Sequence, residues 1–145
     1  MKVTELLEAM GHKEIRATHP TTFEFTRERH LTRRGDCIIG VMASRAAADL
    51  SDEFKAAARS MDTVIRVRME VEGVTDEASG RGHPSLSYID VKSLVARRSG
   101  YVCGRTLMIL SNKAARDLSR TLVNLMKNPK ARMEIILTAE TASRR

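Results

Sequence analysis

The stretch Ser44-Arg45-Ala46-Ala47-Ala48-Asp49-Leu50-Ser51 recurs later in the chain as Asn112-Lys113-Ala114-Ala115-Arg116-Asp117-Leu118-Ser119. The two octapeptides lie 68 residues apart and share two alanines, the aspartate, the leucine and the final serine. A repeat at a fixed spacing is informative because it indicates how the whole chain is organised. The sequence therefore indicates that one structural unit occurs twice, through an internal duplication.

The same spacing of 68 extends beyond the octapeptides. Apolar residues recur at helical intervals in both copies, so we predict helices over residues 44–60 and 112–128. Alternating apolar residues then predict strands over 63–72 and 132–140. The helical positions are Ala47, Leu50, Phe54 and Ala57, then Ala115, Leu118, Leu122 and Leu125; the expected N-caps are Ser44 and Asn112; and the strand positions are Ile65, Val67, Met69 and Val71, then Met133, Ile135, Leu137 and Ala139.

Upstream of each helix the spacing changes to 71, which pairs Gly11-His12 with Gly82-His83; an alternative register pairs His19-Pro20 with His83-Pro84. In the first register each unit reads strand-strand-strand-helix-strand. The further predicted strands are 14–19, 21–27 and 36–43 in one unit and 85–90, 92–97 and 102–111 in the other. Repeat one then covers about 11–73 and repeat two about 82–141, with residues 74–81 as the linker.

The expected fold follows from the size of the repeats. The chain has 145 residues, of which 42% are hydrophobic, and this is enough for one core. Neither repeat has enough apolar surface for a core of its own, so the repeats should pack about a pseudo-twofold axis. We predict a single α+β domain over 1–145, with a mixed or antiparallel sheet, or a barrel, covered by two helices.

Several longer segments carry a family resemblance. They include Thr18-His19-Pro20-Thr21-Thr22-Phe23-Glu24-Phe25, then Arg33-Arg34-Gly35-Asp36-Cys37, then Gly80-Arg81-Gly82-His83-Pro84, then Tyr101-Val102-Cys103-Gly104-Arg105. Together they resemble an archaeal family known as domain of unknown function 371, from about Gly11 to Leu125. The resemblance implies an archaeal cytosolic protein that is usually a stand-alone domain, and it implies no particular activity.

Charge is distributed unevenly along the chain. Residues 1–73 hold 12 basic and 12 acidic side chains, whereas residues 74–145 hold 13 basic and 6 acidic ones, so the whole net charge of +7 lies in the second half. A basic field on one side of a protein attracts phosphate groups. Basic residues cluster on one side of the second predicted helix, and additional ones follow it: Lys113, Arg116, Arg120 and Lys127, then Lys130, Arg132, Arg144 and Arg145.

Binding of structured RNA through this basic helix face is our first functional hypothesis. The matching positions of the first helix are Arg45, Ala48, Asp52 and Arg59, so only the second copy carries the face. Aromatic residues make up 3% of the chain, which argues against a module that stacks single-stranded bases on exposed rings. The alternative for these charges is a solvated helix surface.

A small phosphorylated or carboxylated metabolite, bound at the interface of the repeats, is the second hypothesis, and the protein would then be an enzyme or a sensor. Arginines beside glycine suit anion binding, and a loop histidine beside a carboxylate suits acid–base chemistry, although the same residues also form turns. The strand 21–27 also presents a polar face through Thr22, Glu24 and Thr26. The candidate residues are His19, Arg34, Asp36, Arg81, His83 and Arg105. The third hypothesis is an adaptor that binds another protein by a sheet edge.

Other classes of site have little support in the sequence. A metal site would have to combine His12, His19 and His83 with Asp36 or Cys37, and no local spacing indicates this. None of the common cofactor motifs is present, so we expect no cofactor. The longest apolar stretch, 37–43, is too short to span a membrane, which favours the cytoplasm. Cys37 and Cys103 should then be reduced and mostly buried.

Overall fold

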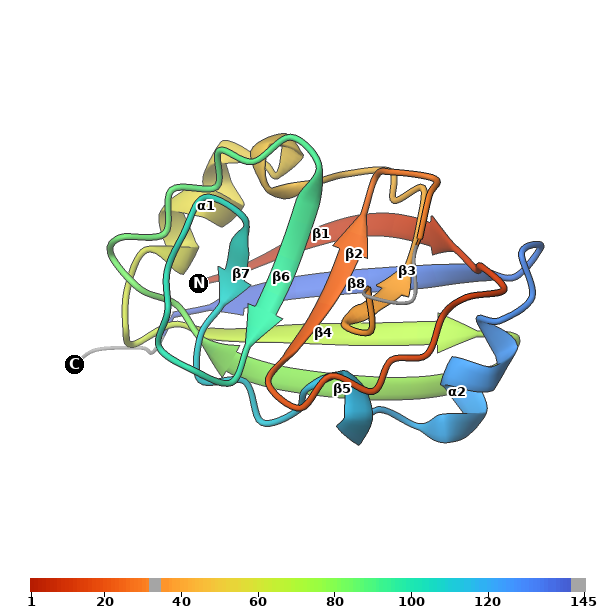
Figure 1. Ribbon diagram of the computed structural model, residues 1–145. Helices are drawn as coiled ribbons and strands as arrows, with labels where there is room; N and C mark the ends of the chain where they lie inside the picture. The colour runs from red at the N-terminus through yellow and green to blue at the C-terminus, as the bar shows by residue number, and fades with distance from the viewer. Residues whose placement is uncertain (32–34, 142–145) are drawn as a thin grey trace.

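The computed structural model describes residues 1–31 and 35–141, which form two four-stranded sheets and a few short helices (Figure 1). The predicted α+β class is confirmed, and the sheets remain open layers rather than a closed barrel. One sheet has the order β1 (Lys2–Met10), β8 (Arg132–Glu140), β4 (Val64–Val71) and β5 (Val74–Arg81); the other has the order β3 (Ile38–Gly40), β2 (Thr22–Thr26), β6 (Ser93–Arg97) and β7 (Thr106–Met108).

The core lies between the two sheets, whose strands cross at a steep angle (Figure 1). Alternation places one face of β4 and of β8 inward, as predicted. Phe23 and Phe25 point inward from the second sheet and are buried edge to face, with ring centroids 6.1 Å apart. The alternate residues of this strand, Thr22 and Glu24, are consequently only half-buried on the outer face.

The two halves of the chain follow the same order of elements. β1 through β4 correspond to β5, β6, β7 and β8, and each half places one short α-helix between its last two strands. The pairing of β1 with β8 matches that of β5 with β4, and the pairing of β2 with β3 matches that of β6 with β7. These registers agree with the spacings of 71 and 68 residues, while origin by duplication stays a prediction.

Three of the predicted segment assignments are wrong. Residues 14–19 and 85–90 are not strands, because Ala17 and Tyr88 adopt left-handed backbone conformations with φ of 49° and 51° that interrupt an extended chain. The first strand of each half lies upstream instead. It is β1 in the first half and, in the second half, β5, which occupies the segment 74–81 that we expected to be a linker.

The predicted helices 44–60 and 112–128 are broken in two. Each consists of a 3-10 turn, η1 (Ala47–Asp49) or η2 (Ala115–Asp117), followed by α1 (Asp52–Ala58) or α2 (Arg120–Leu125). The N-caps are Ser51 and Ser119, whose hydroxyls accept the N–H groups of Phe54 and Leu122 at 3.0 and 3.2 Å.

Ser44 and Asn112 serve another purpose than the predicted one. Their side chains accept the N–H groups of Glu8 and Ser79, at 3.0 and 2.9 Å, and so attach the edge strands β1 and β5 to the following loops. α1 and α2 lie at opposite ends of the sheets (Figure 1). In the part of the chain that the structure describes, no helix is both long and apolar enough to cross a lipid bilayer.

Candidate functional site

Two of the predicted candidates, His19 and Arg105, meet in a hollow on the outer face of the second sheet. Its cavity volume is about 280 Å³. We call it the β2–β6 hollow, and its lining consists of His19, Thr21, Thr22, Glu24, Cys37, Val95, Arg97 and Arg105. Both halves of the chain contribute, so it lies where the second hypothesis expected a pocket.

Antiparallel pairing of β2 with β6 builds the floor of this hollow. Thr22 pairs with Arg97, and Glu24 pairs with Val95. Because alternate residues of β2 are buried phenylalanines, Thr22 and Glu24 point to the outer face, as do their partners on β6. Arg97 is not among the site residues predicted from the sequence. Antiparallel pairing of the two equivalent strands would have placed it opposite Thr22, so the repeat register held the signal that could have found it.

His19 closes the turn that leads into β2. Its Nδ1 atom accepts the backbone N–H groups of Thr21 and Thr22, both at 3.2 Å. The equivalent residue of the second half is Asp90, whose Oδ1 atom accepts the N–H groups of Lys92 and Ser93, both at 2.8 Å. Since Nδ1 is an acceptor, the ring proton of neutral His19 lies on Nε2, and that N–H is available to a ligand.

The two arginines of the hollow differ in their contacts. Arg97 donates from Nε to the Thr106 hydroxyl at 2.9 Å and from Nη2 to the Cys103 sulfur at 3.3 Å. Its guanidinium also lies over the Tyr101 ring, 4.9 Å from the centroid. The exposed guanidinium of Arg105 has no hydrogen-bond or ion-pair partner among residues 1–31 and 35–141. One cation is therefore held in place, and the other is free to bind.

The cysteines have opposite environments, and both are half-buried rather than mostly buried as predicted. Burial and the adjacent Glu24 carboxylate, which accepts the thiol at 3.5 Å, raise the pKa of Cys37 to about 12. Burial also raises the pKa of Cys103, but the Arg105 backbone N–H, the Thr106 hydroxyl and Arg97 outweigh it, so this pKa lies below its ordinary value.

Cys103 should therefore react with a maleimide much faster than Cys37. Reactivity follows the thiolate fraction, so we expect a difference of at least about tenfold near neutral pH. Mass spectrometry of the intact and digested protein at successive times would give both rates, with Cys103→Ser as the control that removes the fast site. Equal rates, or faster labelling of Cys37, would contradict this assignment.

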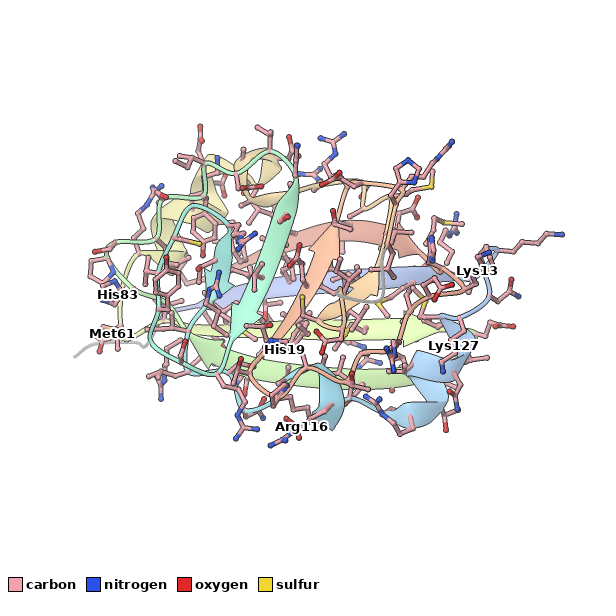
Figure 2. All side chains as sticks on the ribbon, viewed as in Figure 1. Lys13, His19, Met61, His83, Arg116 and Lys127 are labelled. Carbon is pink, nitrogen blue, oxygen red and sulfur yellow. The ribbon has the colours of Figure 1, made fainter. Side chains whose placement is uncertain are left out.

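The other metabolite candidates are scattered. The Asp36 backbone carbonyl accepts the N–H groups of Thr18 and His19, which places Asp36 beside the hollow. Arg81 is exposed at the end of β5, and His83 accepts the Ser85 N–H at the edge of the molecule, away from His19 (Figure 2). Arg34 lies outside the described residues, as do Arg144 and Arg145 of the predicted basic set.

The predicted basic helix face does not form a single surface, because α2 covers only residues 120–125. Lys113 precedes η2 and forms an ion pair of 2.5 Å with the largely buried Asp76, equivalent to the pair of Arg45 with Glu5 in the first half. Arg120 donates to three backbone carbonyls, those of Ala115, Ala17 and Leu118. Two of the four residues thus hold the fold together.

The remaining two members of the predicted face are exposed but separated (Figure 2). The backbone N–H of Arg116 donates to the His19 carbonyl at 3.2 Å, so Arg116 lies beside the β2–β6 hollow. Lys127 lies beyond α2, where it lines a second hollow of about 350 Å³ with Lys13, Glu14, Ile15 and Arg16. No cluster of three or more metal-ligating side chains occurs within residues 1–31 and 35–141.

Comparison with known proteins supports the predicted family resemblance. A family model described as Domain of unknown function (DUF371) matches residues 7–140. The chain is also similar to Uncharacterized protein MJ0206 of the archaeon Methanocaldococcus jannaschii, with 44% identity over 125 residues, which are 86% of this chain and 92% of that protein.

Proposed function

We propose that this chain, which belongs to the family described as Domain of unknown function (DUF371), binds a small phosphorylated or carboxylated metabolite in the β2–β6 hollow. The proposal rests on the geometry of the hollow. The observation that carries this proposal is the meeting of Arg105, Arg97 and His19 in one hollow that both halves line. Ligand sites commonly form at such junctions, where a few polar groups converge.

The donors of the hollow suit an anionic group. Arg105 brings a guanidinium that has no partner among the described residues, and guanidinium binds carboxylate and phosphate through two parallel hydrogen bonds. The His19 Nε2–H adds a neutral donor, and the contacts of Arg97 with Thr106, Cys103 and Tyr101 fix a second positive charge nearby. A rigid cation requires little ordering when a ligand arrives, which favours binding.

Structured RNA is the rival ligand, and it has less support. Lys113 and Arg120, which were predicted to contact phosphates, are bonded within the protein. Lys113 pairs with Asp76, and Arg120 donates to three backbone carbonyls. Substitution of either would disturb the fold as well as any RNA contact. Arg116 and Lys127 are therefore the two members whose replacement would test RNA binding without that complication.

The proposal predicts that Arg105→Gln weakens binding of a small anion. Because hydrogen bonds to charged groups contribute about 1.5–3 kcal/mol, the dissociation constant should rise roughly 10- to 100-fold. Titration of the isotope-labelled protein with inorganic phosphate and with malonate, followed by NMR, would measure it and should shift the amide signals of His19, Thr22 and Arg105 first.

Arg81→Gln is the matched control, because it removes the same charge from an exposed position outside the hollow. Its dissociation constants should stay within about twofold of the wild-type values, which lies inside ordinary scatter for surface changes. Equal losses in both variants would mean that only net charge matters. Absence of anion binding by the wild type, with RNA binding that depends on Arg116 and Lys127, would favour the rival ligand.

A further inference from the structure

A carboxylate stands among the cations of the β2–β6 hollow. Glu24 projects from β2, half-buried, in the same lining as Arg97 and Arg105. One of its oxygens accepts the thiol of Cys37 at 3.5 Å. Its other oxygen has no hydrogen-bond partner in the part of the chain that the structure describes. Glu24 therefore offers a free acceptor to whatever occupies the hollow.

This carboxylate is unfavourable for a bare anion. Like charges repel each other, and a partly desolvated site screens that repulsion less than bulk water does. The neighbouring Cys37 adds no further negative charge, because burial and Glu24 raise its pKa to about 12 and the thiol stays neutral, but a neutral thiol does not offset the Glu24 charge either. A hollow that served only inorganic phosphate or a simple carboxylate would bind it better without Glu24.

The position of Glu24 also makes the hollow directional. The equivalent residue of the second half is Val95, which pairs with Glu24 across the β2–β6 junction, so the negative charge occurs on one side only. In the same way Cys37 of the first half corresponds to Arg105 of the second. The lining therefore has an acceptor side, Glu24 with Cys37, and a cationic side, Arg97 with Arg105.

We infer that the ligand of the β2–β6 hollow is a small molecule with two unlike ends: an anionic group that binds Arg97 and Arg105, and a hydroxyl or ammonium donor that binds Glu24. This inference rests on the proposed anion binding and names the class of ligand. A cavity of about 280 Å³ lies at the small end for ligand pockets, which begin at roughly 300 Å³, so the class is a short hydroxylated or aminated phosphate ester or carboxylate.

The test compares four probes on the wild-type protein: inorganic phosphate, ethyl phosphate, glycerol 3-phosphate and phosphoethanolamine. Ethyl phosphate lacks the donor, glycerol 3-phosphate supplies hydroxyls, and phosphoethanolamine supplies an ammonium. At least one donor-bearing ester should bind about tenfold more tightly than ethyl phosphate, which is the gain expected for a hydrogen bond to a charged group. Whichever of the two binds better identifies the donor.

Glu24→Gln removes the charge of the side chain while keeping its shape. It should change the affinities of the two kinds of probe in opposite directions. Inorganic and ethyl phosphate should bind more tightly because the repulsion is gone, whereas the preferred donor-bearing ester should bind about tenfold more weakly. Glu28→Gln is the control, since Glu28 is exposed and lies outside the lining of the hollow. It should leave the ratio of the two kinds of probe unchanged.

Two outcomes separate this inference from the proposed function. If phosphate esters bind and depend on Arg105, but donor-bearing and donor-free probes bind equally well to the wild type, the hollow binds anions and the inference about the donor is wrong. If no probe binds the wild type, both are wrong. The preference of the wild type needs no substitution, so the test stands even where Glu24→Gln fails to fold.

Discussion

Replacement of Gly82 by alanine should destabilise the protein by at least about 3 kcal/mol or prevent its folding. A Cβ atom at this position would stand 2.1 Å from the carbonyl oxygen of Ala58 and 2.5 Å from that of Ser60. Both obstacles are backbone atoms at the end of α1, which cannot rotate away as a side chain can. Overpacking usually lowers the free energy of unfolding by about 1–3 kcal/mol. A clash with backbone that cannot move should lower it by about 3 kcal/mol or more.

Gly11 occupies the equivalent position in the first half and should behave in the same way. Its Cβ would stand 2.1 Å from the Asn128 oxygen and 2.5 Å from the Met126 oxygen. Both sites require glycine because the backbone there approaches carbonyl groups at the end of a short helix too closely for a side chain to fit. Gly11→Ala and Gly82→Ala should therefore show similar losses.

Gly100→Ala is the matched control, because a Cβ there would meet nothing within 4 Å. Urea denaturation followed by circular dichroism would measure the free energy of unfolding of all three variants and the wild type. We expect Gly100→Ala to stay within about 0.5 kcal/mol of the wild type. A similarly small change for Gly82→Ala would contradict the close approach of Gly82 to α1.

Asp76→Asn should lower the free energy of unfolding by about 2 kcal/mol near neutral pH. The Asp76 carboxylate pairs with Lys113 at 2.5 Å and accepts the N–H of Ser119, the N-cap of α2, at 2.7 Å. Hydrogen bonds to a charged group contribute about 1.5–3 kcal/mol, and the amide cannot replace the ion pair. This contact joins β5, the loop before η2 and the start of α2.

The effect of Asp76→Asn should disappear in acid. Burial tends to raise the pKa of Asp76, but Lys113 and the N–H groups of Ser119 and Glu77 outweigh it, so this pKa lies below the ordinary 3.8. A group with a lowered folded-state pKa contributes its full stability above the unfolded value, and the contribution is lost as the pH falls through the folded value. Wild type and variant should therefore differ fully near pH 7, begin to converge as the pH falls below about 3.8, and coincide below the folded-state pKa.

Glu77→Gln provides the comparison for this prediction. Glu77 neighbours Asp76, is about half exposed, and approaches Arg66 only to 3.8 Å. Exposed pairs of this kind contribute at most about 1 kcal/mol, so this variant should change little at any pH. Chemical denaturation at several pH values would test both variants. A gap between wild type and Asp76→Asn that persists unchanged in strong acid would show that the charge of Asp76 is not the cause.

The edge strands show where local sequence patterns mislead. β1 contains the adjacent leucines Leu6 and Leu7, and inward-facing Glu5 interrupts its apolar face, so its alternation is obscured. β5 is rich in small and acidic residues, which resemble a linker. Position 80 requires glycine because of a tertiary contact: a Cβ there would stand 2.6 Å from the backbone oxygen of Ile109.

The broken helices have a related cause. Glu5 of β1 accepts the backbone N–H of Ser51, and Asp76 of β5 accepts that of Ser119. These long-range bonds hold each serine in place as a helix cap, so the apolar stripe of one predicted helix is shared between a 3-10 turn and a shorter α-helix. A carboxylate more than 40 positions away is invisible to helical periodicity.

The candidate site also combines features that the sequence determines with features that depend on the tertiary structure. The sequence by itself determined the matched spacings, the alternation of β2 and the nature of His19 and Arg105 as candidates, because these depend on residue type and on patterns a few residues long. Only the tertiary structure decided that His19 and Arg105 share a hollow with Arg97 and Glu24. It also decided that Lys113 and Arg120 bond within the protein, because pairing between distant strands selects which side chains meet.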